Sequence, residues 1–243
     1  MAFTTLHLQM EDGVATIVLD RPEARNALNL AMCEELFALS KDLSQEKSSR
    51  ILFIRGAPPA FCAGADLKER ADKDAQWVRE RRMKAFAAYD ALESLPFPVV
   101  AVVEGAAMGA GVEICSVCDF VVATPAAFFG TPEAQRGTIG ATQRLGKIIG
   151  RPLAKDMMFT GRRLSAEEAR TAGLVARVVA KEKLDEELAA IAKAILQAPA
   201  GALRLAKRCI DRSFESDRRG ALAAEVEAID EQLASGTWLG KKP

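Results

Sequence analysis

The chain has 243 residues, of which 49% are hydrophobic and 27% are charged, which is ordinary for a globular protein with a substantial core. Its 33 basic residues equal its 33 acidic residues, so no basic excess favours a nucleic-acid partner. Because no apolar run approaches the roughly 18 residues of a membrane span and the first residues do not resemble a signal peptide, we expect no membrane partner.

The first predicted elements form a β-hairpin. Residues 6–10 and 14–19 have strand-like patterns, and the Asp-Gly pair between them is typical of a tight turn. After the irregular connection RPEARNAL, Asn29 is predicted to cap a helix that runs to about Glu46 with apolar residues on one face. Residues 51–54 then form a short buried strand.

Strands and helices alternate through the middle of the chain. A long amphipathic helix is predicted from about Gln76 to Leu95, and Pro96 and Pro98 stop it before the strand PVVAVVEG. The segment GAAMGAG leads into a helix that ends near Cys118. Further predicted elements are strands at residues 119–123, 127–130 and 174–180, and helices at 142–149, 152–159, 166–172, 184–197 and from 200 onward.

Units of two strands and a helix therefore repeat along the first part of the chain, and a helical tail follows. No linker or low-complexity segment divides the sequence. The predicted fold class is α/β, with residues 1–180 as the core and residues 181–243 as a C-terminal helical region.

Two segments rich in small residues, FCAGADL and GAAMGAGVEIC, are each predicted as a strand, a turn and a helix start. The first N–H groups of a helix have no partner within the helix, so two such turns side by side can aim two donors at one oxygen atom and form an oxyanion hole. Either segment alone is better explained by glycines that allow a helix to pack closely on a strand. A dinucleotide site is disfavoured because the spacing is not GxGxxG.

Two glutamates accompany these turns. Glu113 follows the second turn among apolar neighbours, and Glu133 lies further on in GTPEAQRG. An isolated glutamate is usually a solvated surface residue, but a carboxylate in apolar surroundings is suited to proton transfer. His7 is the only histidine and lies in the predicted hairpin, which excludes nearly all Ser-His-Asp and Cys-His catalysis.

The five cysteines are an odd number in a long chain, which favours reduced thiols and a cytoplasmic location. Cys115 and Cys118 form a single CxxC pair with no second pair and no histidine nearby. We therefore expect buried helical cysteines here and no metal.

Five segments together resemble the enoyl-CoA hydratase/isomerase (crotonase) superfamily in their order and spacing. They are RPEARNALN, FCAGADLKE, GAAMGAGVEICSVCDF, FFGTPEAQRG and TQRLGKIIGRPLAKDMMFTGRRLSAEEARTAGLVARVV. The resemblance covers about residues 5–210 and implies a crotonase-like spiral of repeated ββα units. It also implies an acyl-CoA thioester substrate, no metal or redox cofactor, and a homotrimer or a hexamer made of two trimers. The C-terminal region would serve oligomerisation and cover the active site.

By position, the resemblance assigns the oxyanion hole to the backbone N–H groups of Ala63 and Ala110. It implies that Glu113 activates a water molecule for attack at C3 and that Glu133 delivers a proton to C2. The residues that it places along the path of the substrate and its coenzyme A are Ala24, Ala63, Gly64, Ala65, Asp66, Leu67, Lys68 and Gly109.

Two departures from the family pattern bear on the reaction. The segment GTIGATQRL, residues 137–145, is shorter than the GTIPGAGGTQRL that hydratases commonly carry, and this loop helps to position water. The tail ASGTWLGKKP lacks most of the segment that usually packs over coenzyme A, with Lys241 and Lys242 as partial substitutes for its basic residues.

The predicted function is that of an enoyl-CoA hydratase of lipid metabolism, which adds water reversibly across the 2,3 double bond of a 2-enoyl-CoA. Retention of Glu113 favours hydration over enoyl-CoA isomerisation, which needs one base at the position of Glu133. The sequence also allows another acyl-CoA lyase or hydrolase reaction of the superfamily, or a non-catalytic acyl-CoA binder. Trp77, Met83 and Phe86 are candidates for the acyl pocket, although ordinary core packing explains their helical spacing better.

Overall fold

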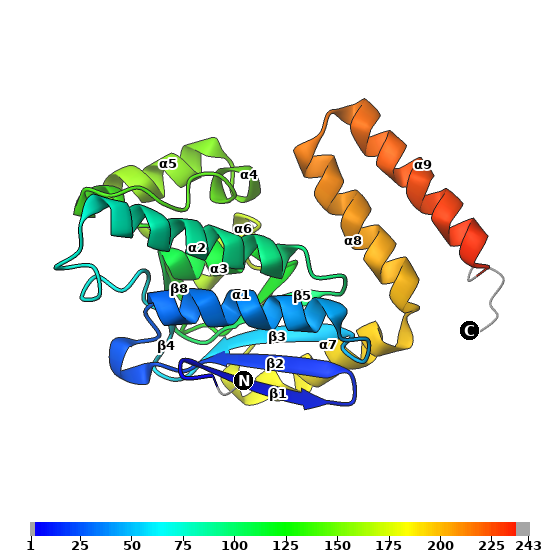
Figure 1. The fold of residues 1–243 in the computed structure, drawn as a ribbon, viewed down its shortest axis with the longest axis horizontal. Coiled ribbons are helices and arrows are strands. Elements are labelled where there is room, and N and C mark those ends of the chain that lie inside the picture. The colour runs from blue at the N-terminus through cyan, green and yellow to red at the C-terminus, as the bar shows by residue number, and fades with distance from the viewer. Residues whose placement is uncertain (1–2, 237–243) are drawn as a thin grey trace.

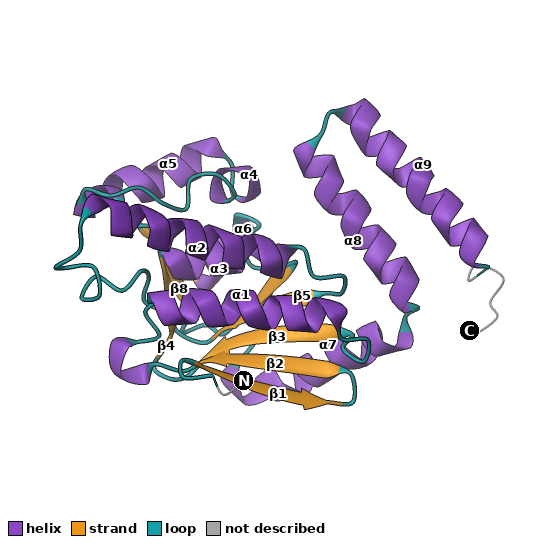
Figure 2. Cartoon of the chain, viewed as in Figure 1, coloured by secondary structure: helices purple, strands orange, loops and turns teal. Residues whose placement is uncertain are grey.

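The structure, a computed structural model, describes residues 3–236 and contains two β-sheets (Figure 2). The strand order in the larger sheet is β1 (Leu6–Glu11), β2 (Val14–Leu19), β3 (Ile51–Gly56), β5 (Val99–Val103), β7 (Phe120–Ala123) and β10 (Arg177–Val178). The strand order in the smaller sheet is β4 (Ala60–Cys62), β6 (Ala106–Met108), β8 (Phe128–Gly130) and β9 (Arg163–Ser165). The pairs β1–β2 and β8–β9 are antiparallel, and the other neighbouring strands are parallel.

A repeat of two strands connects the sheets. Strands β3, β5 and β7 of the larger sheet are followed after short connections by β4, β6 and β8 of the smaller sheet. Helix α2 (Ala75–Glu93) follows the first pair and α3 (Ala110–Val117) follows the second. This arrangement confirms the predicted α/β fold class with repeated ββα units.

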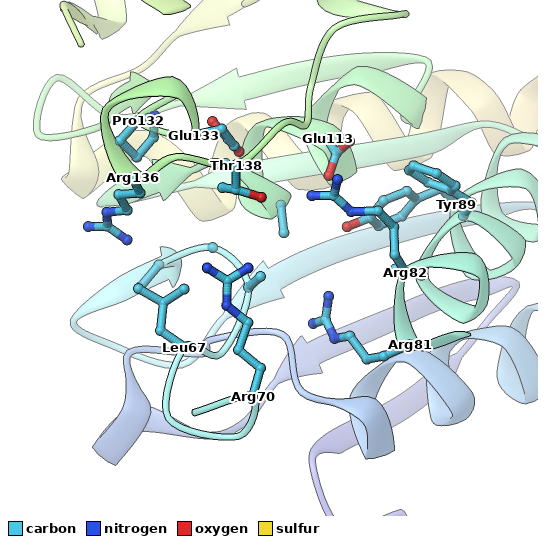
Figure 3. Close-up of a pocket in the computed structure, with 17 residues that line it drawn as sticks. Leu67, Arg70, Arg81, Arg82, Tyr89, Glu113, Pro132, Glu133, Arg136 and Thr138 are labelled. Carbon is cyan, nitrogen blue, oxygen red and sulfur yellow. The ribbon is translucent and has the colours of Figure 1, made fainter. Parts of the chain in front are cut away.

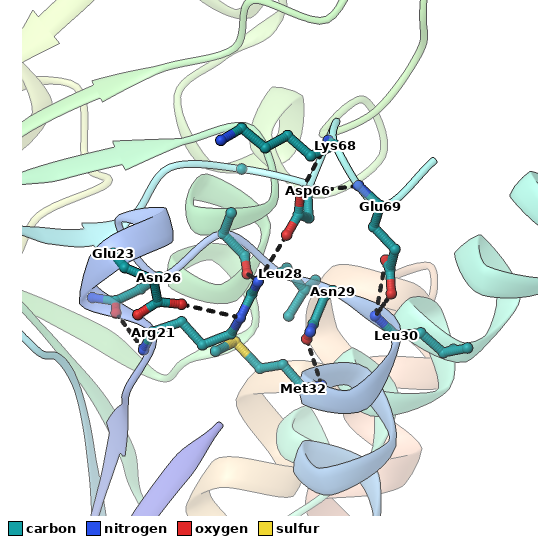
Figure 4. Close-up of polar contacts among 12 residues, drawn as sticks. Arg21, Glu23, Asn26, Leu28, Asn29, Leu30, Met32, Asp66, Lys68 and Glu69 are labelled. Atoms are coloured by element: carbon teal, nitrogen blue, oxygen red, sulfur yellow. Dashed lines mark hydrogen bonds and ion pairs between the residues drawn. The ribbon is translucent and has the colours of Figure 1, made fainter. Parts of the chain in front are cut away.

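The remaining helices precede or follow these repeats. They are α1 (Leu30–Gln45), α4 (Leu145–Ile148), α5 (Arg151–Thr160), α6 (Ala166–Thr171), α7 (Leu184–Gln197), α8 (Ala200–Glu215) and α9 (Arg218–Ser235), with short 3-10 helices at Pro22–Ala24, Ala134–Arg136 and Lys181–Lys183. The structure confirms the cap predicted for the first of them, because the Asn29 side chain accepts a hydrogen bond from the Met32 N–H at 2.9 Å (Figure 4).

The predicted hairpin is also confirmed. Asp12 and Gly13 both have positive φ, of 46° and 83°, which is the backbone that a two-residue turn with the twist of the flanking strands requires. Leu6 therefore pairs with Leu19 and Glu11 with Val14.

Helices cover both faces of the larger sheet. Helices α1 and α2 lie over one face (Figure 1), where Leu36 and Leu92 are fully buried in the main core. Leu188 of α7 packs on the opposite face against Phe53 and Val100. Every residue of β5 is buried, as expected for a central strand of a sheet covered on both sides.

Four predicted elements differ from the structure, and one of them is the strand predicted at residues 174–180, which is formed only at β10. No helix starts directly after FCAGADL, because the chain turns through residues 63–74 before α2 begins at Ala75. The Asp66 side chain accepts the N–H groups of Lys68 and Glu69 and stabilises these turns (Figure 4). The segment GAAMGAG contains β6 rather than a turn alone, and the helix predicted at 142–149 is reduced to α4.

Helices α8 and α9 form a hairpin that extends away from the two sheets (Figure 1). The predicted domain division at residue 180 stays a prediction. Helix α7 packs on the larger sheet, and α8 and α9 extend from it. None of the described helices is alone long and apolar enough to span a membrane, although residues 181–197 and 200–215 together would have the length and composition as a pair bent by 104°. The predicted roles of Lys241 and Lys242 lie outside the described residues.

Candidate active site

One cavity brings the two predicted glutamates together with both small-residue segments (Figure 3). Its walls come from the loop after β4, the inner face of α2, the start of α3 and the segment after β8. Its volume of about 50 Å³ is enough for a water molecule or a small group between the side chains. The residues that line it include Ala63, Gly64, Ala65, Leu67, Gly109, Ala110, Glu113 and Glu133 from the predicted set.

The start of α3 provides free backbone donors. Because the Glu113 N–H donates to Gly109 O at 3.0 Å as the first helical bond, the N–H of Ala110 has no acceptor among residues 3–236. Gly109 has a φ of 50°, and a Cβ at this position would lie 2.5 Å from Oε1 of Glu133. Glycine is therefore required at this position for two reasons: the positive φ, and the lack of room for a side chain beside the Glu133 carboxylate.

The loop after β4 corrects one predicted residue. The N–H of Ala63 donates to Arg25 O at 3.0 Å and so cannot bind a substrate oxygen as predicted. Ala65 differs from Ala63 in its hydrogen bonding, because its neighbours make the bonds to Leu28. The Leu28 N–H donates to Gly64 O at 2.8 Å, and the Asp66 N–H donates to Leu28 O at 2.9 Å. These bonds leave the N–H of Ala65 pointing away from Leu28, without an acceptor in the described part of the chain.

The two loops lie close enough to act on one atom. A Cβ placed on Gly64 would be 3.2 Å from Met108 O, and a Cβ placed on Gly109 would be 3.8 Å from the Gly64 Cα. The free N–H groups of Ala65 and Ala110 therefore lie on neighbouring loops at the same cavity. Both predicted segments meet at this cavity, but the sequence could not indicate which alanine of the first is already bonded.

Glu113 is held by the short loop that departs from the family pattern. Its Oε1 accepts a hydrogen bond from the Ala141 N–H at 2.9 Å. Ala141 has a positive φ of 52°, which is uncommon for a residue with a side chain. The loop of residues 137–145 thus reaches the cavity and orients one of the two carboxylates.

Glu133 is the more buried of the two carboxylates, with 9% of its surface exposed. Its Oε2 is buried and has no hydrogen-bond partner in the described structure. Burial raises the pKa of Glu133 above its ordinary value, the neighbouring Glu113 carboxylate raises it further, and the Arg82 and Arg136 guanidinium groups oppose the rise. A carboxyl group in this environment is suited to donate a proton.

The predicted contacts with coenzyme A divide into two groups. The residues that line the cavity are Ala63, Gly64, Ala65, Leu67 and Gly109, whereas Ala24, Asp66 and Lys68 do not line it. Contact with coenzyme A remains a prediction for all of these residues.

Asp66 has a structural role in the same loop. Its Oδ2 accepts from Arg21 Nη1 at 2.9 Å, and its Oδ1 accepts the N–H groups of Lys68 and Glu69 (Figure 4). Although burial acts to raise it, these hydrogen bonds and the Arg21 charge hold the pKa of Asp66 below its ordinary value. Glu69 accepts the Leu30 N–H at 2.9 Å and ties the loop to the start of α1.

Helix α2 contributes residues that the sequence did not indicate as functional. Arg82, Ala85 and Tyr89 line the cavity, and so does Phe86, one of the candidates for the acyl pocket. Burial, followed by the charge of Glu113, raises the pKa of Tyr89 well above its ordinary value, so the cavity wall carries a neutral phenol. The only indication of this role in the sequence was the spacing of Arg82, Ala85 and Tyr89, which places them on one face of a helix.

Within residues 3–236, the cavity therefore combines two backbone N–H groups that have no acceptor with two carboxylates. Such donors stabilise negative charge that develops on a carbonyl oxygen, and such carboxylates transfer protons at the neighbouring carbons. Among residues 3–236, no three His, Cys, Asp or Glu side chains are grouped so that they could hold a metal ion.

Known proteins share this architecture. A family model described as enoyl-CoA hydratase/isomerase matches residues 9–236. The chain is similar to a probable enoyl-CoA hydratase of Mycobacterium tuberculosis, with 36% identity over 238 residues that cover 97% of this chain and 92% of the relative.

Two solved structures are similar over nearly the whole chain. The crystal structure of an enoyl-CoA hydratase from Bacillus anthracis has a TM-score of 0.90 and 36% identity, covering 93% of this chain and 90% of that one. A Thermobifida fusca protein solved in complex with CoA has a TM-score of 0.88 and 28% identity, covering 96% and 94% of the two chains.

Proposed function

This chain belongs to the enoyl-CoA hydratase/isomerase family, and from that premise we propose that it adds water to the double bond of a 2-enoyl-CoA. The observation that supports hydration is the position of Glu113 and Glu133 at one cavity, beside the N–H groups of Ala65 and Ala110, which have no acceptor in the described part of the chain. The solved relative from Thermobifida fusca in complex with CoA supports an acyl-CoA substrate.

The proposed reaction begins with the thioester carbonyl at the two backbone donors. Its oxygen accepts hydrogen bonds from the N–H groups of Ala65 and Ala110, which stabilise the enolate charge that develops there. Glu113, held by Ala141, accepts a proton from water while the water oxygen bonds to C3. Glu133 gives its proton to C2, which its raised pKa favours. The proton that Glu113 took from water then returns to Glu133, so both carboxyl groups regain their starting protonation states. One molecule of water is added and no cofactor takes part.

Substitution of each glutamate tests this proposal. In the wild-type protein, the conjugated-thioester absorbance of crotonyl-CoA should disappear rapidly, whereas Glu113→Gln and Glu133→Gln should each lose at least about 100-fold in rate. Circular dichroism of each variant serves as the control for folding. Absence of hydration by the folded wild-type protein would refute short-chain hydration. Conversion of a 3-enoyl-CoA that survives Glu113→Gln but not Glu133→Gln would indicate an isomerase.

We also propose that the α8–α9 hairpin packs against other copies of the chain in a homotrimer or a hexamer. Several large apolar side chains of these helices are about half exposed or more. They are Ile210, Phe214, Leu222, Val226, Ile229 and Leu233. An apolar surface of this kind on an extended hairpin supports a protein interface. Light scattering after size-exclusion chromatography should give the mass of three or six chains, and the mass of one chain would refute the proposal.

The cytoplasmic location and the absence of a cofactor remain predictions from the sequence.

A further inference from the structure

Some of the arginine side chains that line the cavity form no ion pair with an acidic residue in the described part of the chain. Four arginines and two glutamates line it, so its walls carry an excess of positive charge (Figure 3). Arg81 is already bonded to Leu28 O and lies 3.8 Å from Glu69. Arg70, Arg82 and Arg136, in contrast, make no side-chain hydrogen bond or ion pair within residues 3–236.

Arg82 differs from the other two unpaired arginines in its position. It extends from α2 on the side of the cavity occupied by Glu113 and Tyr89, whereas Arg70 extends from the loop that carries Leu67 (Figure 3). Arg136 is exposed and lies beside Pro132, on the opposite side of the cavity from Tyr89 (Figure 3). Arg82 is therefore the unpaired arginine next to the carboxylates expected to act on the acyl group.

Gly140 keeps open the space between Arg82 and Glu133. A Cβ at Gly140 would lie 3.4 Å from Oε1 of Glu133 and 3.6 Å from Nη2 of Arg82, although Gly140 itself is buried. The two side chains thus face one small space without forming an ion pair with each other. Because Gly140 has no side chain, the loop of residues 137–145 places no side-chain atom at this point.

An unpaired guanidinium in a partly buried cavity is unfavourable unless a ligand supplies an anion. Arginine is particularly suited to a carboxylate, because its planar N–H groups match both oxygens. A neutral acyl chain would leave the Arg82 guanidinium without an anionic partner. A carboxylate on the acyl chain would pair with Arg82, and the positive charge of the lining arginines would attract it.

We propose that Arg82 selects 2-enoyl-CoA substrates whose acyl chain ends in a carboxylate one or two carbons beyond C3. The proposal rests on the proposed function, because it assumes that C2 and C3 lie between the two glutamates and that the thioester oxygen lies at Ala65 and Ala110. The chain beyond C3 then continues toward α2, and its carboxylate pairs with Arg82. The substrate class is thus a dicarboxylic enoyl-CoA rather than a simple fatty enoyl-CoA.

Binding of two unreactive acyl-CoA molecules tests this role separately from catalysis. Glutaryl-CoA carries the terminal carboxylate and butyryl-CoA lacks it, and calorimetry measures the affinity of each. The wild-type protein should bind glutaryl-CoA about 10- to 100-fold more tightly, as expected for a charge-assisted hydrogen bond. Arg82→Met should bring the ratio of the two affinities close to one. Arg79→Met, an exposed arginine on the same helix, is the matched control and should keep the wild-type ratio.

Equal affinities in the wild-type protein would overturn the proposal, and so would a preference that survives in Arg82→Met. The wild-type comparison needs no variant, so the test stands even if Arg82→Met does not fold. Hydration of crotonyl-CoA and of glutaconyl-CoA, the 2-enoyl form of glutaryl-CoA, is measured in parallel. Hydration of neither compound would contradict the proposed hydratase function, whereas hydration without any preference for glutaryl-CoA in binding would contradict only the role of Arg82.

Discussion

Substitution of Gly109 by alanine should displace the Glu133 carboxylate without changing its chemical identity. Gly109 has φ 50° and ψ −108°, a backbone that residues with a side chain rarely adopt, and forcing alanine into it costs about 1–3 kcal/mol. In a chain of this size, that loss lowers the melting temperature by about 2–12 °C.

The added methyl group should also displace the carboxylate. It would lie 2.5 Å from Oε1 of Glu133, whereas ordinary contact starts at 3.4 Å, so the carboxylate must move by about 0.9 Å. A misplacement of this size can lower the rate of a positioned reaction by about 100-fold. Gly109→Ala should therefore lose about 100-fold in crotonyl-CoA hydration while its Glu133 carboxyl group is intact.

Thermal unfolding and steady-state hydration of crotonyl-CoA measure the two effects. The matched control is Gly146→Ala in α4, where a Cβ would meet its nearest atom, the Ala154 Cβ, at 3.9 Å. This variant should stay within about 1 kcal/mol of the wild-type stability. If Gly109→Ala kept both the melting temperature and the rate of the wild type, the close approach of Glu133 to the start of α3 would be wrong.

Three further changes test other parts of the site. Ala141→Gly should raise the free energy of unfolding by about 0.5–1 kcal/mol in urea titrations, since glycine accepts the positive φ, and a decrease would contradict the strain. Burial raises the pKa of Glu133, so its effect on stability is most favourable below the ordinary value of 4.5 and is lost as the pH rises through the raised pKa. The unfolding free energy of the wild type should accordingly fall relative to Glu133→Gln as the pH rises above 4.5, and parallel curves would refute this. Asp66→Asn should lower the unfolding free energy by about 1–3 kcal/mol, because Arg21 loses its closer and more buried charged partner. The difference between the variant and the wild type should shrink in acid below pH 3.8, whereas a pH-independent difference would argue against the ion pair.

Local patterns in the sequence were sufficient for most of the fold. The Asp-Gly turn set the register of β1 on β2, and the Asn29 cap fixed the start of α1. These features depend on residues close together in the chain. The small residues around Ala110 and the apolar neighbours of Glu113 likewise predicted a turn with a carboxylate on the following helix, and the structure has both.

Contacts between distant segments could not be predicted in the same way. Ala63 and Ala65 have identical side chains, and only the approach of Arg25 and Leu28 decides which N–H group is free. The bond from Ala141 to Glu113 likewise depends on how a shortened loop folds back over α3.

Arg82 lies in the charged run RERRMK, which by composition resembles a solvent-facing stretch of α2. Its place at the cavity follows from how that helix is rotated on the core, with Ala85 and Tyr89 buried on the same face. Packing of this kind is a tertiary property, so sequence composition alone misleads here.

The most direct measurement of the central claim is the origin of the oxygen in the product. Crotonyl-CoA is incubated with the protein in water enriched in oxygen-18, and the product is analysed by mass spectrometry. The proposed function predicts 3-hydroxybutyryl-CoA with one heavy oxygen at C3, formed by the wild type and at least about 100-fold more slowly by Glu113→Gln and Glu133→Gln. A wild-type protein that binds crotonyl-CoA but incorporates no heavy oxygen, or one whose incorporation is unchanged in both variants, would contradict the two-glutamate hydratase.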